Sequence, residues 1–144
     1  MTALSAKFGE RWPVVTRQPD VATVLVVEDN PANMTLATFL LKSAGYAVLS
    51  AVDAEAGLAL ARSEQPDLVL MDIQLPGMDG LQATAVLKGD AATRDIPVIA
   101  LTALAMKGDE ERIRAAGCDG YIAKPLAYRE FLAIIAARLP KATV

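Results

Sequence analysis

The sequence predicts an α/β fold in which helices cover both faces of a five-stranded, doubly wound parallel sheet. From Thr23 onward, short aliphatic runs alternate five times with longer segments of helical spacing, and strand–helix repeats of this kind build open parallel sheets. The runs VLVV (24–27) and LVLM (68–71) are also continuously apolar, which is typical of strands buried on both faces.

The expected strands are rich in β-branched and aliphatic residues, and each precedes a helical segment. They cover residues 23–27, 46–51, 67–71, 98–101 and 120–123. The first helix is expected to be capped by Asn30, to start at Pro31 and to stop at Gly45. Its apolar face is expected to consist of Met34, Ala37, Leu41 and Ala44.

Four further helices follow the same alternation. Asp53 is expected to cap the second, which runs to about residue 64, and the third covers about 80–88. The fourth, about 107–116, has few apolar residues and depends on Ile113 for its packing. The last helix has the clearest apolar stripe and is expected to end at Pro140. That stripe consists of Tyr128, Phe131, Leu132, Ile135 and Leu139.

Composition excludes several classes of protein. The chain has 144 residues, 53% of them hydrophobic and 22% charged, which suits one compact domain with its own core. The lack of histidine excludes a Ser-His-Asp triad, a His-ligated zinc and a phosphohistidine on this chain. The single cysteine, Cys118, excludes an internal disulfide, which fits the cytoplasm. A net charge of −3 argues against direct nucleic-acid binding, and the apolar runs are too short for a membrane-spanning helix.

The first 22 residues differ in character from the rest of the chain. They mix three basic residues with two prolines and the only tryptophan, Trp12, without a helical or strand period. We expect residues 1–22 to be an N-terminal extension or linker, 23–140 to form the folded domain, and 141–144 to be a C-terminal tail. Two alternatives stay open for the extension: Trp12 packs onto the surface of the domain, or the segment joins the domain to another one, such as a kinase.

Polar residues follow the expected strands, at the edge where parallel sheets bind ligands. The second strand contributes least, as expected for a strand at the outside of the sheet. Three carboxylates, one hydroxyl and one ammonium would meet at this edge. Glu28, Asp29 and Asp72 supply the carboxylates, Thr102 the hydroxyl and Lys124 the ammonium. The full set of residues directly after the strands is Glu28, Asp29 and Asn30 after the first strand, Val52 and Asp53 after the second, Asp72 after the third, Thr102 after the fourth and Lys124 after the fifth.

This set of side chains suggests a phosphoryl acceptor. Crowding of Glu28, Asp29 and Asp72 would force one carboxylate to take up a proton unless cations lie nearby. Lys124 supplies one positive charge, and oxygen ligands without histidine or thiolate indicate Mg²⁺ as a second cation. A carboxylate beside a metal can attack phosphorus, while the metal, the lysine and the hydroxyl of Thr102 share the charge of the phosphoryl oxygens.

Four segments resemble the signature regions of the response regulator receiver family, the CheY-like phosphoacceptor domains. They are VLVVEDN (24–30), DLVLMDIQLPGMDG (67–80), PVIALTA (97–103) and GYIAKP (120–125). The run AMKGDEERIRAAGCDGYIAKP (105–125) further resembles single-domain regulators of the DivK type, although receivers of hybrid kinases are similar there. The resemblance implies a flavodoxin-like fold with strand order 2-1-3-4-5 and a role in two-component or phosphorelay signalling.

The resemblance also implies a role for each residue of the site. Asp72 would be the phosphorylated residue. Asp29, Asp72 and the main-chain carbonyl of Gln74 would bind Mg²⁺ directly, and Glu28 would bind it through water. The donor would be a sensor histidine kinase or a histidine phosphotransfer protein. A downstream protein would bind the face formed by the fourth helix, the fifth strand and the fifth helix.

The remaining implied roles concern switching and phosphate lifetime. Thr102 and Lys124 would each contact a phosphoryl oxygen, and Tyr121 would turn inward as Thr102 moves. The bond between Lys124 and Pro125 would be cis. Leu104 cannot orient an attacking water, which predicts slow self-dephosphorylation.

Several alternatives stay open. Glu28, Asp29 and Asn30 could simply cap a helix, and Asp72 could be a turn residue, but isolated caps would not recur at the ends of other strands. A P-loop and a dinucleotide fingerprint are missing from the sequence. An aspartyl-phosphate hydrolase would carry D-x-D after the first strand, where Glu28 and Asp29 are adjacent. Two alternatives lie within the receiver family. The chain could be a receiver that only binds partners without being phosphorylated, or a receiver module excised from a hybrid histidine kinase or other multidomain regulator.

Overall fold

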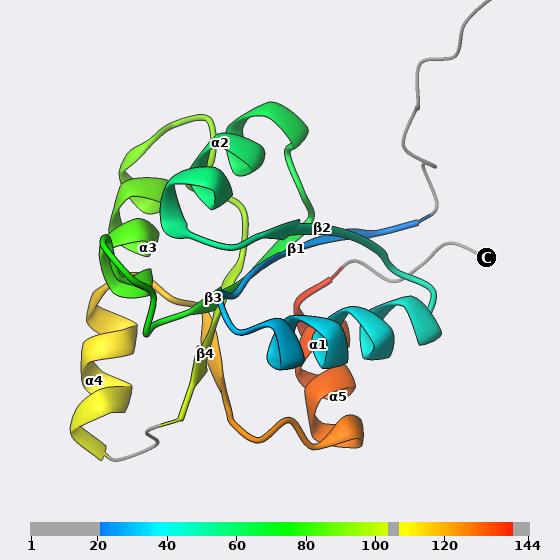
Figure 1. Cartoon of the computed structure of the whole chain (residues 1–144). Helices are drawn as coiled ribbons and strands as arrows, with labels where there is room; N and C mark the ends of the chain where they lie inside the picture. The colour runs from blue at the N-terminus through cyan, green and yellow to red at the C-terminus, as the bar shows by residue number, and fades with distance from the viewer. Residues whose placement is uncertain (1–20, 104–106, 140–144) are drawn as a thin grey trace, which may run out of the picture.

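The computed structural model describes residues 21–103 and 107–139, which form five strands and five helices in strict alternation (Figure 1). The strands are β1 (Thr23–Val27), β2 (Ala47–Ala51), β3 (Leu68–Asp72), β4 (Val98–Thr102) and β5 (Gly120–Ala123). The helices are α1 (Pro31–Ser43), α2 (Ala54–Glu64), α3 (Gly80–Gly89), α4 (Lys107–Ala115) and α5 (Tyr128–Arg138).

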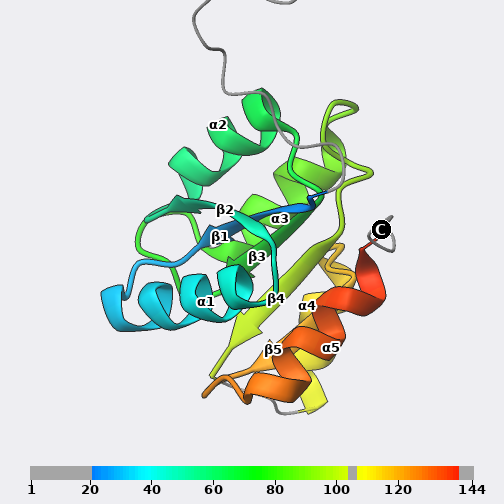
Figure 2. The same cartoon turned by 90° about the vertical axis from the view of Figure 1, so that its right-hand side faces the viewer.

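All five strands are parallel and lie in the order β2-β1-β3-β4-β5. Helices α1 and α5 cover one face of the sheet, and α2 and α3 cover the other (Figures 1 and 2). The predicted doubly wound fold and its strand order are therefore confirmed.

Each central strand supplies both faces of the sheet with apolar side chains. In β1, Val24 and Val26 pack on the side of α1 and α5, whereas Leu25 and Val27 pack on the side of α2 and α3. All four are fully buried, because successive side chains of a strand point to opposite faces. The prediction that the continuously apolar runs are buried on both faces is correct.

Two strands extend one residue further than predicted, and the extra residue is polar in both. Asp72 pairs with Leu101, and Thr102 pairs with Ala123. Asp72 and Thr102 are therefore the last paired residues of their strands, and the sheet itself fixes their backbone positions. Asp67, predicted to begin a strand, instead accepts a hydrogen bond from the backbone N–H of Thr23 at 2.7 Å.

The predicted helix caps are present. The side chain of Asn30 accepts a hydrogen bond from the backbone of Asn33 at 3.0 Å, and Asp53 accepts one from Ala56 at 2.8 Å. Ile113 is buried and holds α4 against the sheet, as predicted.

Two predictions about apolar helix faces are wrong. Ala44 is exposed, because it is the C-cap residue of α1 and lies past its last turn, and Leu40 is buried on that face in addition to Ala37 and Leu41. Tyr128 is also exposed, at 56%, because it is the first residue of α5 and a stripe position at a helix end is covered on one side only. Phe131 and Ile135 of the predicted stripe are fully buried, as predicted.

The predictions for Trp12, Leu104 and Pro140 fall outside the described residues. Within residues 21–103 and 107–139, no helix has the length and apolar character needed to cross a membrane. The carbonyl of Ala22 already accepts a hydrogen bond from Ala47 at 3.0 Å, so the chain joins the sheet directly before β1.

Candidate functional site

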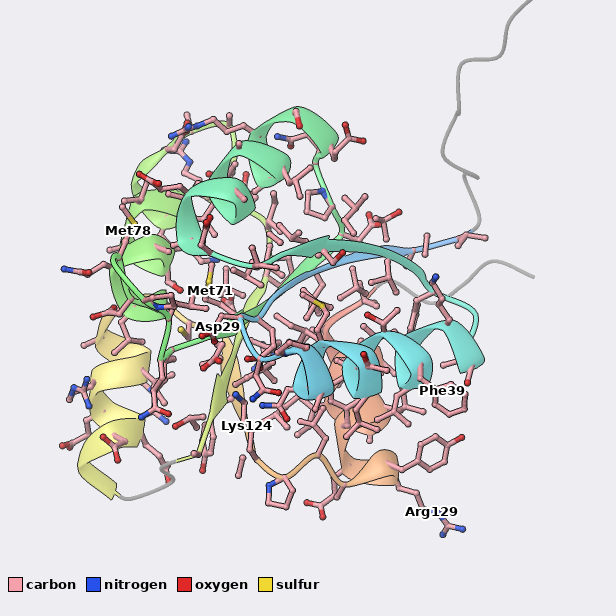
Figure 3. All side chains as sticks on the ribbon, in the orientation of Figure 1. Asp29, Phe39, Met71, Met78, Lys124 and Arg129 are labelled. Carbon is pink, nitrogen blue, oxygen red and sulfur yellow. The ribbon has the colours of Figure 1, made fainter. Side chains whose placement is uncertain are left out.

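The polar residues predicted to meet do lie at one edge of the sheet. Glu28 and Asp29 directly follow β1, and Asp72 is the last residue of its strand. Because β1 and β3 are neighbours in a parallel sheet, their carboxyl ends point the same way. Lys124 enters from the far strand, β5, and Figure 3 shows it near Asp29 beside the start of α1.

Lys124 joins two of the three carboxylates. Its Nζ lies 2.9 Å from Oε1 of Glu28 and 3.1 Å from Oδ2 of Asp72. Burial of the ammonium works to lower the pKa of Lys124, but the contacts with the two carboxylates outweigh it and raise the pKa above its usual value. The lysine therefore stays charged at neutral pH and supplies the fixed positive charge of the site.

The surroundings of Glu28 disfavour its ionised form. It is only 1% exposed, and burial raises its pKa, as does the nearby carboxylate of Asp72. Lys124 and the backbone N–H of Asn30, which donates to Oε2 at 3.1 Å, oppose this shift without cancelling it. The sequence predicts that crowding favours a protonated carboxylate when no second cation is bound. The structure shows this effect at Glu28, whose pKa is raised.

Asp72 is held by the loop that follows it. Its Oδ1 accepts a hydrogen bond from the backbone N–H of Gln74 at 2.9 Å, and the backbone N–H of Gly80 donates to the carbonyl of Ile73 at 3.2 Å. A Cβ at position 80 would lie 2.1 Å from the carbonyl oxygen of Asp72, so only glycine allows α3 to start this close.

The acidic residues fit a divalent cation. Glu28, Asp29 and Asp72 each offer a carboxylate oxygen, and these oxygens all lie within 4.8 Å of one another. Asp29 is exposed, whereas the other two are buried, so one side of the cluster is open to solvent. Oxygen ligands with a solvent-open side suit Mg²⁺, which usually keeps several of its waters.

Thr102 and Tyr121 occupy different environments. Thr102 is 1% exposed, and its carbonyl accepts a hydrogen bond from the backbone of Lys124 at 2.8 Å. Tyr121 does not lie in the acidic site: it packs against the small cluster of Ile73, Ala100 and Ile113, and hydrogen bonding to the Glu110 carboxylate raises the pKa of its hydroxyl. The inward movement of Tyr121 stays a prediction.

The predicted cis bond is present, and a comparison with known families identifies the family of this chain. The bond between Lys124 and Pro125 is cis. A model of the response regulator receiver domain matches residues 24–136. The chain belongs to the response regulator receiver family.

Known receivers are similar in sequence and in structure. Polar-differentiation response regulator DivK of Brucella anthropi is 50% identical over 117 residues, which cover 81% of this chain and 95% of that protein. The receiver domain of sensor histidine kinase PA1611 from Pseudomonas aeruginosa is 38% identical, with a TM-score of 0.76. The match covers 81% of this chain and 96% of that domain, whose structure was solved with a magnesium ion coordinated in the active site cleft. Chemotaxis protein CheY4 of Vibrio cholerae is 25% identical with a TM-score of 0.79, over 83% of this chain and 99% of its own.

These likenesses confirm the resemblance and the DivK-type assignment. The protein is a receiver of the two-component response regulator class, a signalling domain rather than an enzyme of the usual kind. Magnesium is the general cofactor of the family, and histidine kinases and downstream proteins are its general partners.

Sequence reasoning missed one contact of the receiver site. It assigned Glu28 to a water-mediated role at the metal, whereas the structure also pairs its carboxylate directly with Lys124. No local motif links these two residues, since they follow different strands. Only the balance of charge at this edge indicates that Lys124 pairs with a carboxylate, and it does not show which carboxylate forms the ion pair.

Proposed function

We propose that Asp72 accepts a phosphoryl group from the phosphohistidine of a partner protein in a Mg²⁺-dependent reaction, and that this modification changes the binding of a downstream protein. The observation that carries the proposal is the environment of Asp72: its buried carboxylate lies 3.1 Å from Lys124 and within an acidic cluster suited to a divalent cation. The donor would be a sensor histidine kinase or a histidine phosphotransfer protein in the cytoplasm.

The transfer exchanges one bond to phosphorus for another. A carboxylate oxygen of Asp72 forms the new P–O bond as the P–N bond to the imidazole breaks, and the imidazole nitrogen keeps the electron pair and then takes a proton. This chain contains no histidine, so the imidazole belongs to the partner. The ammonium of Lys124 and the hydroxyl of Thr102 would stabilise the negative charge on the phosphoryl oxygens.

Four residues of this site are proposed for metal binding. Asp29, Asp72 and the main-chain carbonyl of Gln74 would hold Mg²⁺ directly, and Glu28 would act through water. Bound Mg²⁺ would neutralise charge on the phosphoryl group. The backbone N–H of Gln74, hydrogen-bonded to Asp72, keeps this segment beside the acceptor carboxylate.

Intact-mass analysis after incubation with acetyl phosphate and Mg²⁺ tests the proposal. We expect the wild-type chain to gain one phosphoryl group, and Asp72→Asn or addition of a chelator to abolish the gain. Asp95→Asn is the matched control, because Asp95 is an exposed carboxylate in the segment that precedes β4 and should leave the gain unchanged. An unmodified wild-type chain, or equal modification of Asp72→Asn, would show that Asp72 is not the acceptor.

Output and phosphate lifetime are proposed on the same basis. Inward movement of Tyr121, which packs against the cluster of Ile73, Ala100 and Ile113, would change the surface of α4, β5 and α5. Leu104, which cannot orient water, would make the phosphoryl group long-lived. Residues 23–140 are proposed as the receiver, with 1–22 as an extension or linker and 141–144 as a tail.

A receiver module of a hybrid histidine kinase is the second candidate. It is favoured by the 38% identity to the receiver domain of PA1611, a sensor histidine kinase. Transfer assays separate the two candidates: a module of this kind would accept its phosphoryl group fastest from the transmitter histidine of one kinase, whereas a DivK-type regulator would exchange it with separate kinases.

A further inference from the structure

The outward face of α1 is an apolar surface without a cover among the described residues. Its side chains line a shallow hollow, and two of them are large and exposed: Leu36 at 40% and Phe39 at 66%. Figure 3 shows Phe39 at the outer surface of α1. We call this surface the α1 patch; it consists of Pro31, Ala32, Thr35, Leu36 and Phe39.

The sequence of α1 is unusual for a surface helix. Its inner face buries Ala37, Leu40 and Leu41 against the sheet, and its outer face is also largely apolar, with Thr35 as the one polar residue of the α1 patch. The sequence carries no charged residue from position 31 until Lys42. A helix that is apolar on all sides is normally buried on all sides, and a contiguous exposed apolar patch marks an interaction surface.

We propose that the N-terminal segment of this same chain, residues 1–20, docks on the α1 patch through Trp12. The segment contains the aromatic and aliphatic side chains that such a surface would bury: Phe8, Trp12, Val14 and Val15. Burial of Trp12 against Leu36 and Phe39 would remove apolar area of both partners from water.

The chain enters the fold at a place from which Trp12 can reach the patch. The carbonyl of Ala22 accepts a hydrogen bond from the backbone N–H of Ala47, and Ala47 comes four residues after Ser43, the last residue of α1. The segment before β1 therefore enters the fold near the C-terminal end of α1. The patch spans about 12 Å along the helix axis, from Phe39 to Pro31, at 1.5 Å per residue. The connecting residues 13–21 can extend to about 30 Å, so the tether covers the distance from the helix end to any part of the patch.

Tethering favours this occupant over a second molecule. A segment joined by a short linker is present at an effective concentration of about a millimolar, well above that of a second copy or another protein at micromolar concentration. The receiver model begins only at residue 24, so residues 1–20 lie before the receiver. Because the patch begins at Pro31, directly after Asp29 and Asn30, the docked segment would stand beside the acidic site and compete with proteins that approach over α1.

Trp12 is the only tryptophan of the chain, so its fluorescence tests the docking directly in the 144-residue chain. We expect its emission to be blue-shifted relative to the same chain in urea, with acrylamide quenching reduced several-fold. Leu36→Ser/Phe39→Ser should move both values toward those in urea. Val86→Ser is the matched control, because Val86 is a 37% exposed aliphatic residue on α3, across the sheet from α1, and it should change neither.

The outcomes separate the occupants. Values that stay constant from micromolar to hundred-micromolar protein support docking within one chain, whereas a blue shift that appears only at high concentration assigns the patch to a second copy and overturns the proposal. Emission in buffer equal to that in urea, or emission unchanged in the double variant, also overturns it and leaves the patch for another protein. Far-ultraviolet circular dichroism checks that the variants are folded, and Phe39→Ser alone serves if the double variant is not.

Discussion

Lys124 and Glu28 show how single side chains prepare the receiver site for a cation. The lysine satisfies two carboxylates at once, but three carboxylates and one ammonium still leave a negative excess. Burial and the neighbouring Asp72 raise the pKa of Glu28, so in metal-free protein the ionised form of Glu28 is disfavoured relative to that of an exposed glutamate. The site is thus least stable where Glu28 is ionised and no metal is bound.

Glu28→Gln is expected to stabilise the metal-free protein at neutral pH. The pKa of Glu28 in the folded state is raised above its usual 4.5, so its contribution to stability is fully present below pH 4.5 and is lost as pH rises through the folded value. Glutamine imitates the protonated form at every pH. Urea unfolding in the presence of a chelator should therefore show the variant to be more stable at pH 7, with the difference disappearing below pH 4.5.

Asp95→Asn is the control for this experiment, since Asp95 is exposed and should change stability little at either pH. A Glu28→Gln variant that is less stable than wild type at pH 7 without metal would contradict the raised pKa. The same variant should gain less from added Mg²⁺, because it lacks one negative charge of the cluster.

Among the secondary-structure elements, α3 determines where the loop after Asp72 can lie. A capping box begins the helix: Asp79 accepts a hydrogen bond from the backbone of Gln82 at 2.8 Å, and the Gln82 side chain accepts one from the backbone of Asp79 at 3.0 Å. A Cβ on Gly80 would collide with the backbone of Asp72 and Ile73, so the helix starts close against these residues. The helix start therefore positions the acceptor residue through backbone contacts.

Gly80→Ala and Gly89→Ala form a matched pair at the two ends of α3. The new Cβ at position 80 would lie 2.1 Å from the Asp72 carbonyl oxygen, whereas at position 89 nothing lies within 4 Å. We expect Gly80→Ala to lower the free energy of unfolding by about 1–3 kcal/mol. Gly89→Ala should raise it by up to about 1 kcal/mol.

Chemical denaturation of both variants measures the two changes, and phosphorylation by acetyl phosphate shows whether the loop still presents Asp72. Equal stability of the two variants would mean that the close contact between α3 and Asp72 is absent. Loss of phosphorylation in Gly89→Ala would mean that the helix acts through something other than this contact.

The complete fold separates its acidic edge from the apolar cores on the two faces of its sheet. Both faces of β1 and β3 are buried, so the sheet resists deformation. The acidic residues lie at the carboxyl edge, where one carboxylate is exposed. A cation can therefore bind there without disturbing either core.

Magnesium is expected to stabilise the whole domain against unfolding. A ligand that binds only the folded state contributes about 2.7 kcal/mol when its free concentration is about 100 times Kd. Thermal unfolding of wild type should therefore shift upward as MgCl₂ is added, and Asp29→Asn should reduce the shift strongly. Sodium chloride at equal ionic strength is the control, and an equal shift with this salt would show that screening, not binding, is responsible.

Local patterns in the sequence were sufficient for much of the fold. The alternation of aliphatic runs with helical segments predicted the parallel sheet, because each strand and helix is defined by residues close in the chain. Asn30 and Asp53 were recognised as caps because a cap bonds a backbone group three residues away. Apolar spacing is less informative at the ends of helices. It predicts that Ala44 and Tyr128 are buried, whereas both are exposed in the structure.

The composition of the acidic edge was also readable, because parallel strands all end on the same side. The contacts within it depend on the packed fold. Lys124 and Asp72 are 52 residues apart, and no spacing rule says that the lysine also meets Glu28 while Tyr121 stays outside. Side-chain partners across a sheet are set by the twist and register of strands that the chain brings together only on folding, and burial then sets the pKa values on which the chemistry depends.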